Sequence, residues 1–149
     1  MNKLRTIRIG DTDYPMLCDL NVLETLQEEF GSVNTFERKL LGLEFVKDED
    51  GNQVYQADGK PKMTLVDPSI KAIKIALVEM VNEGIAYSAY SEGKQWDMID
   101  DLMLVANCTM PYTEIANIVH EEYKRCFETK KPMPREKKTT RSKKSTSLG

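Results

Sequence analysis

The stretch 69–91 constrains the fold most, because it contains no proline and repeats apolar side chains three or four positions apart, the spacing of an α-helix. Asp67 and Pro68 precede it, and a capping carboxylate followed by a proline suits the first turn of a helix. We therefore predict a long helix over about 68–91. Gly84 costs about 1 kcal/mol relative to alanine inside this helix, so it marks either close packing or a bend. The apolar stripe consists of Ile70, Ile73, Leu77, Met80, Val81 and Ile85.

Two short apolar segments predict a β-hairpin over 4–18, ahead of this helix. Residues 4–9 alternate apolar and polar side chains imperfectly, and 14–18 resume an apolar run after a Gly-Asp-Thr-Asp turn. Pro15 has no backbone N–H to donate, so the second strand should be an edge strand or should turn that position outward.

Two helix start signals follow the hairpin. A capping box at Asn21 predicts a helix near 20–30, and a second box at Asn34 predicts a shorter helix, about 34–41. Each predicted helix is followed by a glycine, which is a common helix terminator.

Residues 43–66 change to strand-like segments around two Asp-Gly turns. This pattern predicts a β-hairpin or small meander inserted between the short helices and the long one. The acids 48–50 lie in the first turn, but they lack the DxDxDG order and the distant glutamate of a calcium loop. A solvated turn is therefore the favoured interpretation.

Two further helices are predicted after the long one. Asp97 caps the first, whose apolar side should hold Met98, Leu102 and Val105. The second follows Pro111 and ends near residue 129, because the prolines beyond it cannot continue a helix. Its apolar side consists of Ile115, Ile118, Val119, Tyr123 and Cys126.

Charge divides the chain into an acidic body and a basic tail. Residues 130–149 carry eight lysines or arginines and one acid, a charge of +7, whereas residues 1–129 carry 13 basic and 23 acidic side chains, a charge of −10. The tail has few apolar side chains, so it cannot offset the entropy cost of ordering and is predicted to be disordered. We predict one globular domain over 1–129, of the α+β class and mainly α-helical, with an N-terminal β-hairpin and about five helices.

The sequence offers few groups for catalysis or ligand chemistry. No apolar run reaches the roughly 20 residues that cross a bilayer, and charges interrupt the first ten residues, which excludes a membrane span and a secretory signal. Cys18, Cys108 and Cys126 are widely spaced and are predicted to be reduced thiols. With one histidine and none of the common metal, nucleophile or phosphate motifs, an enzyme is disfavoured and no cofactor or metal is expected.

His120 and a group of aspartates are the residues that could suggest a metal or acid–base site. His120 has no neighbour three or four positions away that would share a metal, so a surface histidine is the favoured interpretation. Asp97, Asp100 and Asp101 could support acid–base or magnesium chemistry, but acids in a first helical turn also complement the helix dipole. The dipole interpretation is favoured.

Tyr87, Tyr90 and Trp96 gather where the long helix gives way to the next one. Aromatic side chains at such a junction serve either as a cap of the core or as anchors for a partner. The core is the favoured interpretation, and a partner-binding surface formed by these three residues with Met98 is the alternative.

The basic tail suggests an arm that contacts nucleic acid phosphates. Two features argue against nucleic acid as a partner: the tail has no aromatic side chain on which a base could stack, and the acidic body would repel a phosphate backbone. A solubilising or protein-docking tail is at least as well supported. The basic residues are Lys130, Lys131, Arg135, Lys137, Lys138, Arg141, Lys143 and Lys144.

The order of these signals resembles that of the tail assembly chaperones of long-tailed bacteriophages and related prophages. The resemblance covers most of residues 4–126 and lies in the layout of the chain. It is carried by the strand pair that ends at Tyr14–Asp19 and by the segments Leu20–Gly31, Lys71–Gly84 and Met110–Ala116.

The resemblance implies a small, mostly helical, non-catalytic protein that binds the tape measure protein while the tail tube polymerises around it. It also implies residence in the cytoplasm of the bacterial host and absence from the finished virion, with the tail tube protein and further copies of the chain as other partners. A tape measure protein has apolar helical stretches that would self-associate unless a helical partner covered them. Segment 43–66 departs from the family's mostly helical pattern. The alternative function is a nucleic-acid-associated regulator that acts through the basic tail.

Overall fold

The computed structural model describes residues 3–128, and it confirms the α+β class that the sequence predicts. The described chain forms an N-terminal β-hairpin, five helices and a second, small hairpin. The basic tail, predicted to be disordered over 130–149, lies outside the described residues. In chain order the elements are β1 (Arg5–Ile9), β2 (Thr12–Met16), α1 (Leu20–Phe30), α2 (Val33–Leu41), β3 (Leu43–Phe45), β4 (Met63–Leu65), α3 (Ile70–Ser91), α4 (Asp101–Ala106) and α5 (Tyr112–Arg125).

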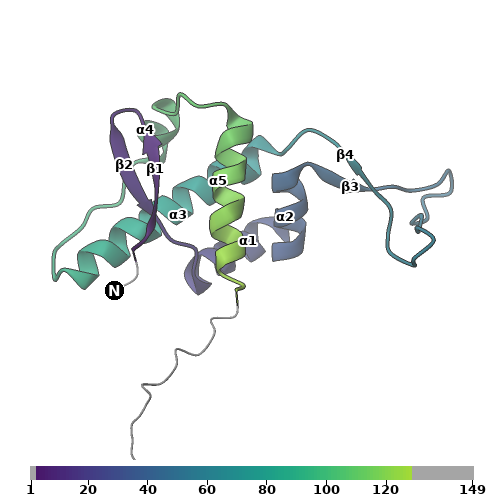
Figure 1. Ribbon diagram of the computed structural model, residues 1–149, viewed down its shortest axis with the longest axis horizontal. Helices are drawn as coiled ribbons and strands as arrows, with labels where there is room; N and C mark the ends of the chain where they lie inside the picture. The colour runs from purple at the N-terminus through teal and green to yellow at the C-terminus, as the bar shows by residue number, and fades with distance from the viewer. Residues whose placement is uncertain (1–2, 129–149) are drawn as a thin grey trace, which may run out of the picture.

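The long helix α3 is the central element, and β2, α1, α2, α4 and α5 all contact it (Figure 1). The predicted apolar stripe of this helix is buried or packed against the core except at its first residue. Ile70, the first residue of the stripe, is 47% exposed. It occupies the first turn of α3, on the side where α1 and α4 leave the helix open.

Four helices begin at capping residues two or three positions away from those predicted. In each case the residue before the first helical turn is extended, and its side-chain oxygen accepts a backbone N–H from within that turn. The predicted caps carry side chains of the right type, but the chain enters the helical conformation elsewhere. The observed caps are Asp19, Ser32, Ser69 and Asp100.

The N-terminal hairpin packs directly on the backbone of α3. β1 and β2 are antiparallel, with Ile7 opposite Tyr14, and together they form a two-stranded sheet. β2 is therefore an edge strand, as Pro15 predicts. The amide of Leu17 donates a hydrogen bond of 3.0 Å to the carbonyl oxygen of Met80, and a Cβ atom at Gly84 would lie 2.5 Å from the carbonyl oxygen of Pro15. Close packing, rather than a bend, explains Gly84.

Residues 43–66, here called the arm, project from the helical body (Figure 1). Three backbone hydrogen bonds of 2.9–3.0 Å link Val46, Val54 and Lys62 to one another in a closed set. The side-chain amide of Gln53 donates to the carbonyl oxygens of Val46 at 3.2 Å and Val54 at 3.0 Å. The predicted hairpin or small meander is thus confirmed, and polar contacts rather than an apolar core hold it together.

Helix α4 has a different buried side from the one predicted. Leu104 is 1% exposed, whereas Leu102 is 72% exposed. The cause lies before the helix, where the carboxamide of Asn82 accepts the amide of Ile99 at 2.7 Å. This contact fixes the chain before α4, so the helix begins after Asp100 instead of after Asp97.

The last helix, α5, has the apolar side that the sequence predicts. Ile115, Val119 and Tyr123 are buried, and Ile118 and Cys126 pack against the core. The helix ends at Arg125 rather than near residue 129. Beyond it, amide-to-carbonyl hydrogen bonds three residues apart tighten the final turn.

Candidate functional site

An open trough of about 610 Å³ lies between α1, α3 and α4. Thr25 and Glu29 of α1 line one side, and Asp101, Leu102 and Val105 of α4 line the other. Helix α3 provides the floor. The floor residues are Ile70, Lys71, Lys74, Ile75, Val78 and Glu79.

The floor consists of two parallel rows of α3 side chains. Residues four positions apart on a helix lie above one another and form ridges, between which the side chains of a second helix fit. The trough thus exposes the kind of surface that one helix normally presents to another. The first row is Ile70, Lys74 and Val78, and the second is Lys71, Ile75 and Glu79.

The lining of the trough is charged, with two cations and three acids among its residues. Lys71 is already engaged, because its Nζ lies 3.9 Å from Glu29 Oε1 and 5.9 Å from the ring centre of Phe30. Lys74, Glu79 and Asp101 complete the set. The trough therefore has the same negative sign as the body of the chain.

The four residues considered for a partner surface are all exposed: Tyr87 by 41%, Tyr90 by 76%, Trp96 by 45% and Met98 by 70%. The favoured interpretation of the three aromatic residues as a cap of the core is therefore wrong. After α3 the chain turns at Gly93 and runs without helix or strand to α4, so no element covers these rings. None of the four lines the trough.

Sequence reasoning missed the exposed apolar residues of the trough. Ile70 and Leu102 belong to the predicted apolar sides of their helices, yet both line the trough and are 47% and 72% exposed. An apolar stripe shows which side of a helix is apolar, but it does not show whether another element covers each residue of that side. The position of α4 along α3 decides this, and no local pattern specifies that position.

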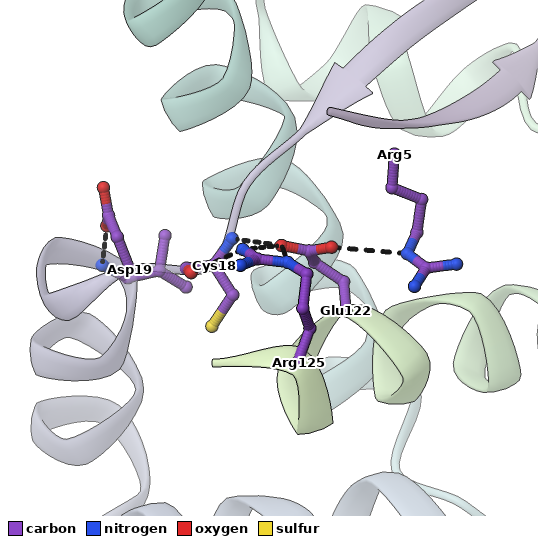
Figure 2. A network of polar contacts seen from close by, with 6 residues as sticks. Arg5, Cys18, Asp19, Glu122 and Arg125 are labelled. Carbon is purple, nitrogen blue, oxygen red and sulfur yellow. Dashed lines mark hydrogen bonds and ion pairs between the residues drawn. The ribbon is translucent and has the colours of Figure 1, made fainter. Parts of the chain in front are cut away.

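A buried carboxylate joins α5 to the connection between β2 and α1 (Figure 2). Glu122 is 0% exposed, and its Oε2 accepts the amide of Cys18 at 2.8 Å and Nε of Arg125 at 2.9 Å. Its Oε1 accepts Nε of Arg5 at 3.3 Å. The hydrogen bond to Glu122 raises the pKa of Arg125, whose guanidinium also donates to the carbonyl oxygen of Cys18 at 3.1 Å. One acid thus connects three segments of the chain.

Glu122 could have been suspected from its position in the sequence. It lies four residues after Ile118 and seven after Ile115, on the side of α5 predicted to be apolar. A charged residue on such a face, with Arg125 three positions on, indicates a buried ion pair. Only the fold brings Arg5 and Cys18 to it.

Tyr87 lies at a second hollow, of about 560 Å³, beside this network. Arg5, Arg125 and Lys3 face Asp19 and Glu128 there. These three cations and two acids give the hollow a net charge of +1, and both of its arginines bind the buried carboxylate of Glu122.

His120 is more buried than predicted, because its side chain is 16% exposed. Its Nε2 lies 2.8 Å from Glu37 Oε2 of α2, so the imidazole joins two helices. The aspartates at the start of α4 support the dipole interpretation, since the cap Asp100 and the first helical residue Asp101 accept the amide of Leu102 at 2.8 and 2.9 Å. Asp97 lies outside the helix.

Labelling of native cysteines should show that Cys18 is the least reactive of the three. Its side chain is 2% exposed and burial raises the pKa of its thiol, while the thiolate is the reactive form. We expect iodoacetamide at pH 8 to modify Cys18 at least ~tenfold more slowly than Cys126, as followed by peptide mass spectrometry. In 8 M urea the rates should converge; equal rates in the native chain would contradict the burial.

Glu83→Gln should raise the melting temperature at pH 7. A hydrogen bond with Asp19, followed by burial and nearby acids, raises the pKa of Glu83 above its ordinary 4.5. Because the pKa of Glu83 is higher in the folded chain than in the unfolded chain, protonation of this residue favours the folded state. This contribution is fully present at a pH below the unfolded-state pKa, and it is lost as the pH rises through the folded-state pKa. Since glutamine cannot ionise, the variant should have the higher melting temperature at pH 7, and this difference should vanish below about pH 4.

The exposed acid Glu28 of α1 provides the control for this pH series. Glu28→Gln removes the same charge without touching Asp19, so it should change the melting curve little at either pH. A stabilisation by Glu83→Gln that persists unchanged at low pH would show that the charge of Glu83 is not its cause.

Within residues 3–128, no helix is long and apolar enough to cross a membrane. In the same range, no group of three or more histidine, cysteine, aspartate or glutamate side chains is arranged to hold a metal ion. In comparisons with known proteins, no family model matches this chain, and no curated protein or solved structure matches it either.

Proposed function

We propose that this chain is a non-catalytic tail assembly chaperone of a long-tailed bacteriophage or prophage. It binds the tape measure protein and keeps it soluble while the tail tube assembles around it. It acts in the cytoplasm of the bacterial host and is absent from the finished virion. The tail tube protein and further copies of the chain are its other partners.

The observation that carries this proposal is the trough. Its exposed apolar residues, Ile70 and Leu102 among them, lie between helices on an acidic body. Exposed apolar residues gathered in a groove with a polar surround are a common feature of sites for another protein. A tape measure protein offers matching apolar helical stretches, and covering them would prevent its self-association.

Co-expression tests the proposal directly. The full chain is produced with the very long helical protein encoded at the same locus, and the soluble, co-purifying fraction of that protein is measured in moderate salt. We expect a large gain in solubility and a stable complex, since apolar contacts depend weakly on salt. No gain in solubility would overturn the proposal.

The basic tail carries the second candidate function, association with nucleic acid. Its charge of +7 would drive phosphate contacts that weaken steeply with salt. Changing its eight lysines and arginines to glutamine separates the two functions. If this variant still forms the complex with the tape measure protein, the chaperone function is supported. If the unmodified chain forms no such complex and binds nucleic acid through its tail in a salt-sensitive way, the regulatory function is supported.

A further inference from the structure

We infer that the trough binds a single amphipathic α-helix of a partner protein, with one apolar face and with lysine or arginine on its flanks. The inference rests on the proposed function for the source of that helix, the tape measure protein. It adds the site on this chain and the chemistry of the bound segment.

The dimensions of the trough suit a short helix. Its floor extends over ten residues of α3, from Ile70 to Glu79, which corresponds to about 14 Å or about two and a half helical turns at 1.5 Å per residue. The helices on both sides also contribute side chains four positions apart, Thr25 with Glu29 and Asp101 with Val105. A helix with apolar residues at positions i, i+3 or i+4, and i+7 would place them between these ridges.

The charges of the trough favour basic side chains on the flanks of the bound helix. The lining holds three acids and two lysines, and Lys71 is already paired with Glu29. Lys74, Glu79 and Asp101 remain, with a net charge of −1 that favours basic side chains on the bound helix. The net charge of −10 over residues 1–129 acts in the same direction. An acidic helix or a nucleic acid would meet repulsion at this site.

The helices of a second copy do not meet this description. Helices α1, α2, α3 and α5 already bury their apolar sides in the described core. Helix α4 has exposed apolar residues, but it is six residues long and spans little more than half of the floor. Since no helix within residues 3–128 of a second copy fits the trough, we assign the bound helix to another protein.

Fluorescence polarisation with designed peptides tests the inference on the full chain. The probe is a fluorescein-labelled amphipathic helix with leucines at every third or fourth position and lysines on its flanks. One comparison peptide has glutamates in place of the lysines, and another has the same composition without helical periodicity. We expect saturable binding of the probe, binding at least ~threefold weaker for the glutamate version, and none for the aperiodic version.

Two exposed leucines provide a matched pair of variants. Leu102→Glu places a charge in the trough and should weaken probe binding at least ~tenfold, because the bound helix would bury that charge. Leu65→Glu alters a leucine of β4 that is 79% exposed and does not line the trough, so binding should be unchanged. Absence of probe binding, or equal loss in both variants, overturns the inference.

A charge exchange keeps the test valid if Leu102→Glu fails to fold. Glu79→Lys should weaken binding of the lysine peptide and strengthen binding of the glutamate peptide, a reversal that misfolding cannot produce. The unmodified chain could instead dimerise in a concentration-dependent way, and Leu102→Glu could abolish this dimerisation. That result would assign the trough to a second copy and overturn the inference. If the Leu102→Glu variant still co-purifies with the tape measure protein, this site is refuted while the proposed function stands.

Discussion

Glu122→Ala is expected to destabilise the folded chain by about 3 kcal/mol, because removing one partner of a buried ion pair leaves the others uncompensated. The amide of Cys18 would lose its 2.8 Å acceptor inside the protein, and Arg5 and Arg125 would lose their common carboxylate. Thermal unfolding followed by circular dichroism should show a midpoint lower by about 10 °C. The effect is a large fraction of the stability of a typical domain.

The neighbouring acid Glu121 is the matched control for this variant. It lies on the same helix and pairs with Lys124 at 2.9 Å on the exposed side of α5. Glu121→Ala removes an equal charge from the same turn, so its melting curve should stay close to that of the unmodified chain. Equal destabilisation by both variants would show that burial of Glu122 is not the cause.

Gly84→Ala should destabilise the chain by about 2 kcal/mol, although alanine is the better helix former. The added Cβ atom would lie 2.5 and 2.6 Å from the carbonyl oxygen and carbon of Pro15, both of which are backbone atoms. Relief of this contact requires the hairpin to move away from α3. Hydrogen exchange should therefore speed up at the amide of Leu17, which donates to Met80.

Ser88→Ala, one turn further along α3, provides the comparison. The position is half-buried within the same helix, and alanine there should be neutral or slightly stabilising. A Gly84→Ala variant that behaves like Ser88→Ala, with unchanged exchange at Leu17, would contradict the close approach of the hairpin.

Local patterns predicted the elements well where each signal lies within a few residues. The period of the apolar residues predicted α3 and α5, and the Asp-Gly turns predicted the arm. The caps were less well predicted, because 19–21 and 67–69 each contain two residues whose side chains can accept a helix N–H, Asp19 with Asn21 and Asp67 with Ser69. The contacts of each helix with the rest of the chain decide where its first turn begins.

The candidate site was beyond the reach of local patterns. Tyr87, Tyr90, Trp96 and Met98 are exposed as a partner surface would require, but the trough is formed by other residues. Its wall residue Leu102 is exposed because Asn82 holds Ile99 and fixes where α4 begins. That contact joins positions 17 residues apart, and neither residue signals it alone.

The sequence by itself determined the helices, the two hairpins and the division of charge, because the period of apolar residues, turn residues and charge are properties of neighbouring positions. Only the tertiary structure decided which apolar side chains are covered and which acid is buried. Ile70 and Ile73 share one helical stripe, yet α1 and α4 leave the first exposed while the core covers the second. Glu122 and Glu121 are adjacent, yet one is fully buried and the other exposed. Burial depends on elements brought together from distant parts of the chain, and it fixes both the stability of this fold and the surface left open for a partner.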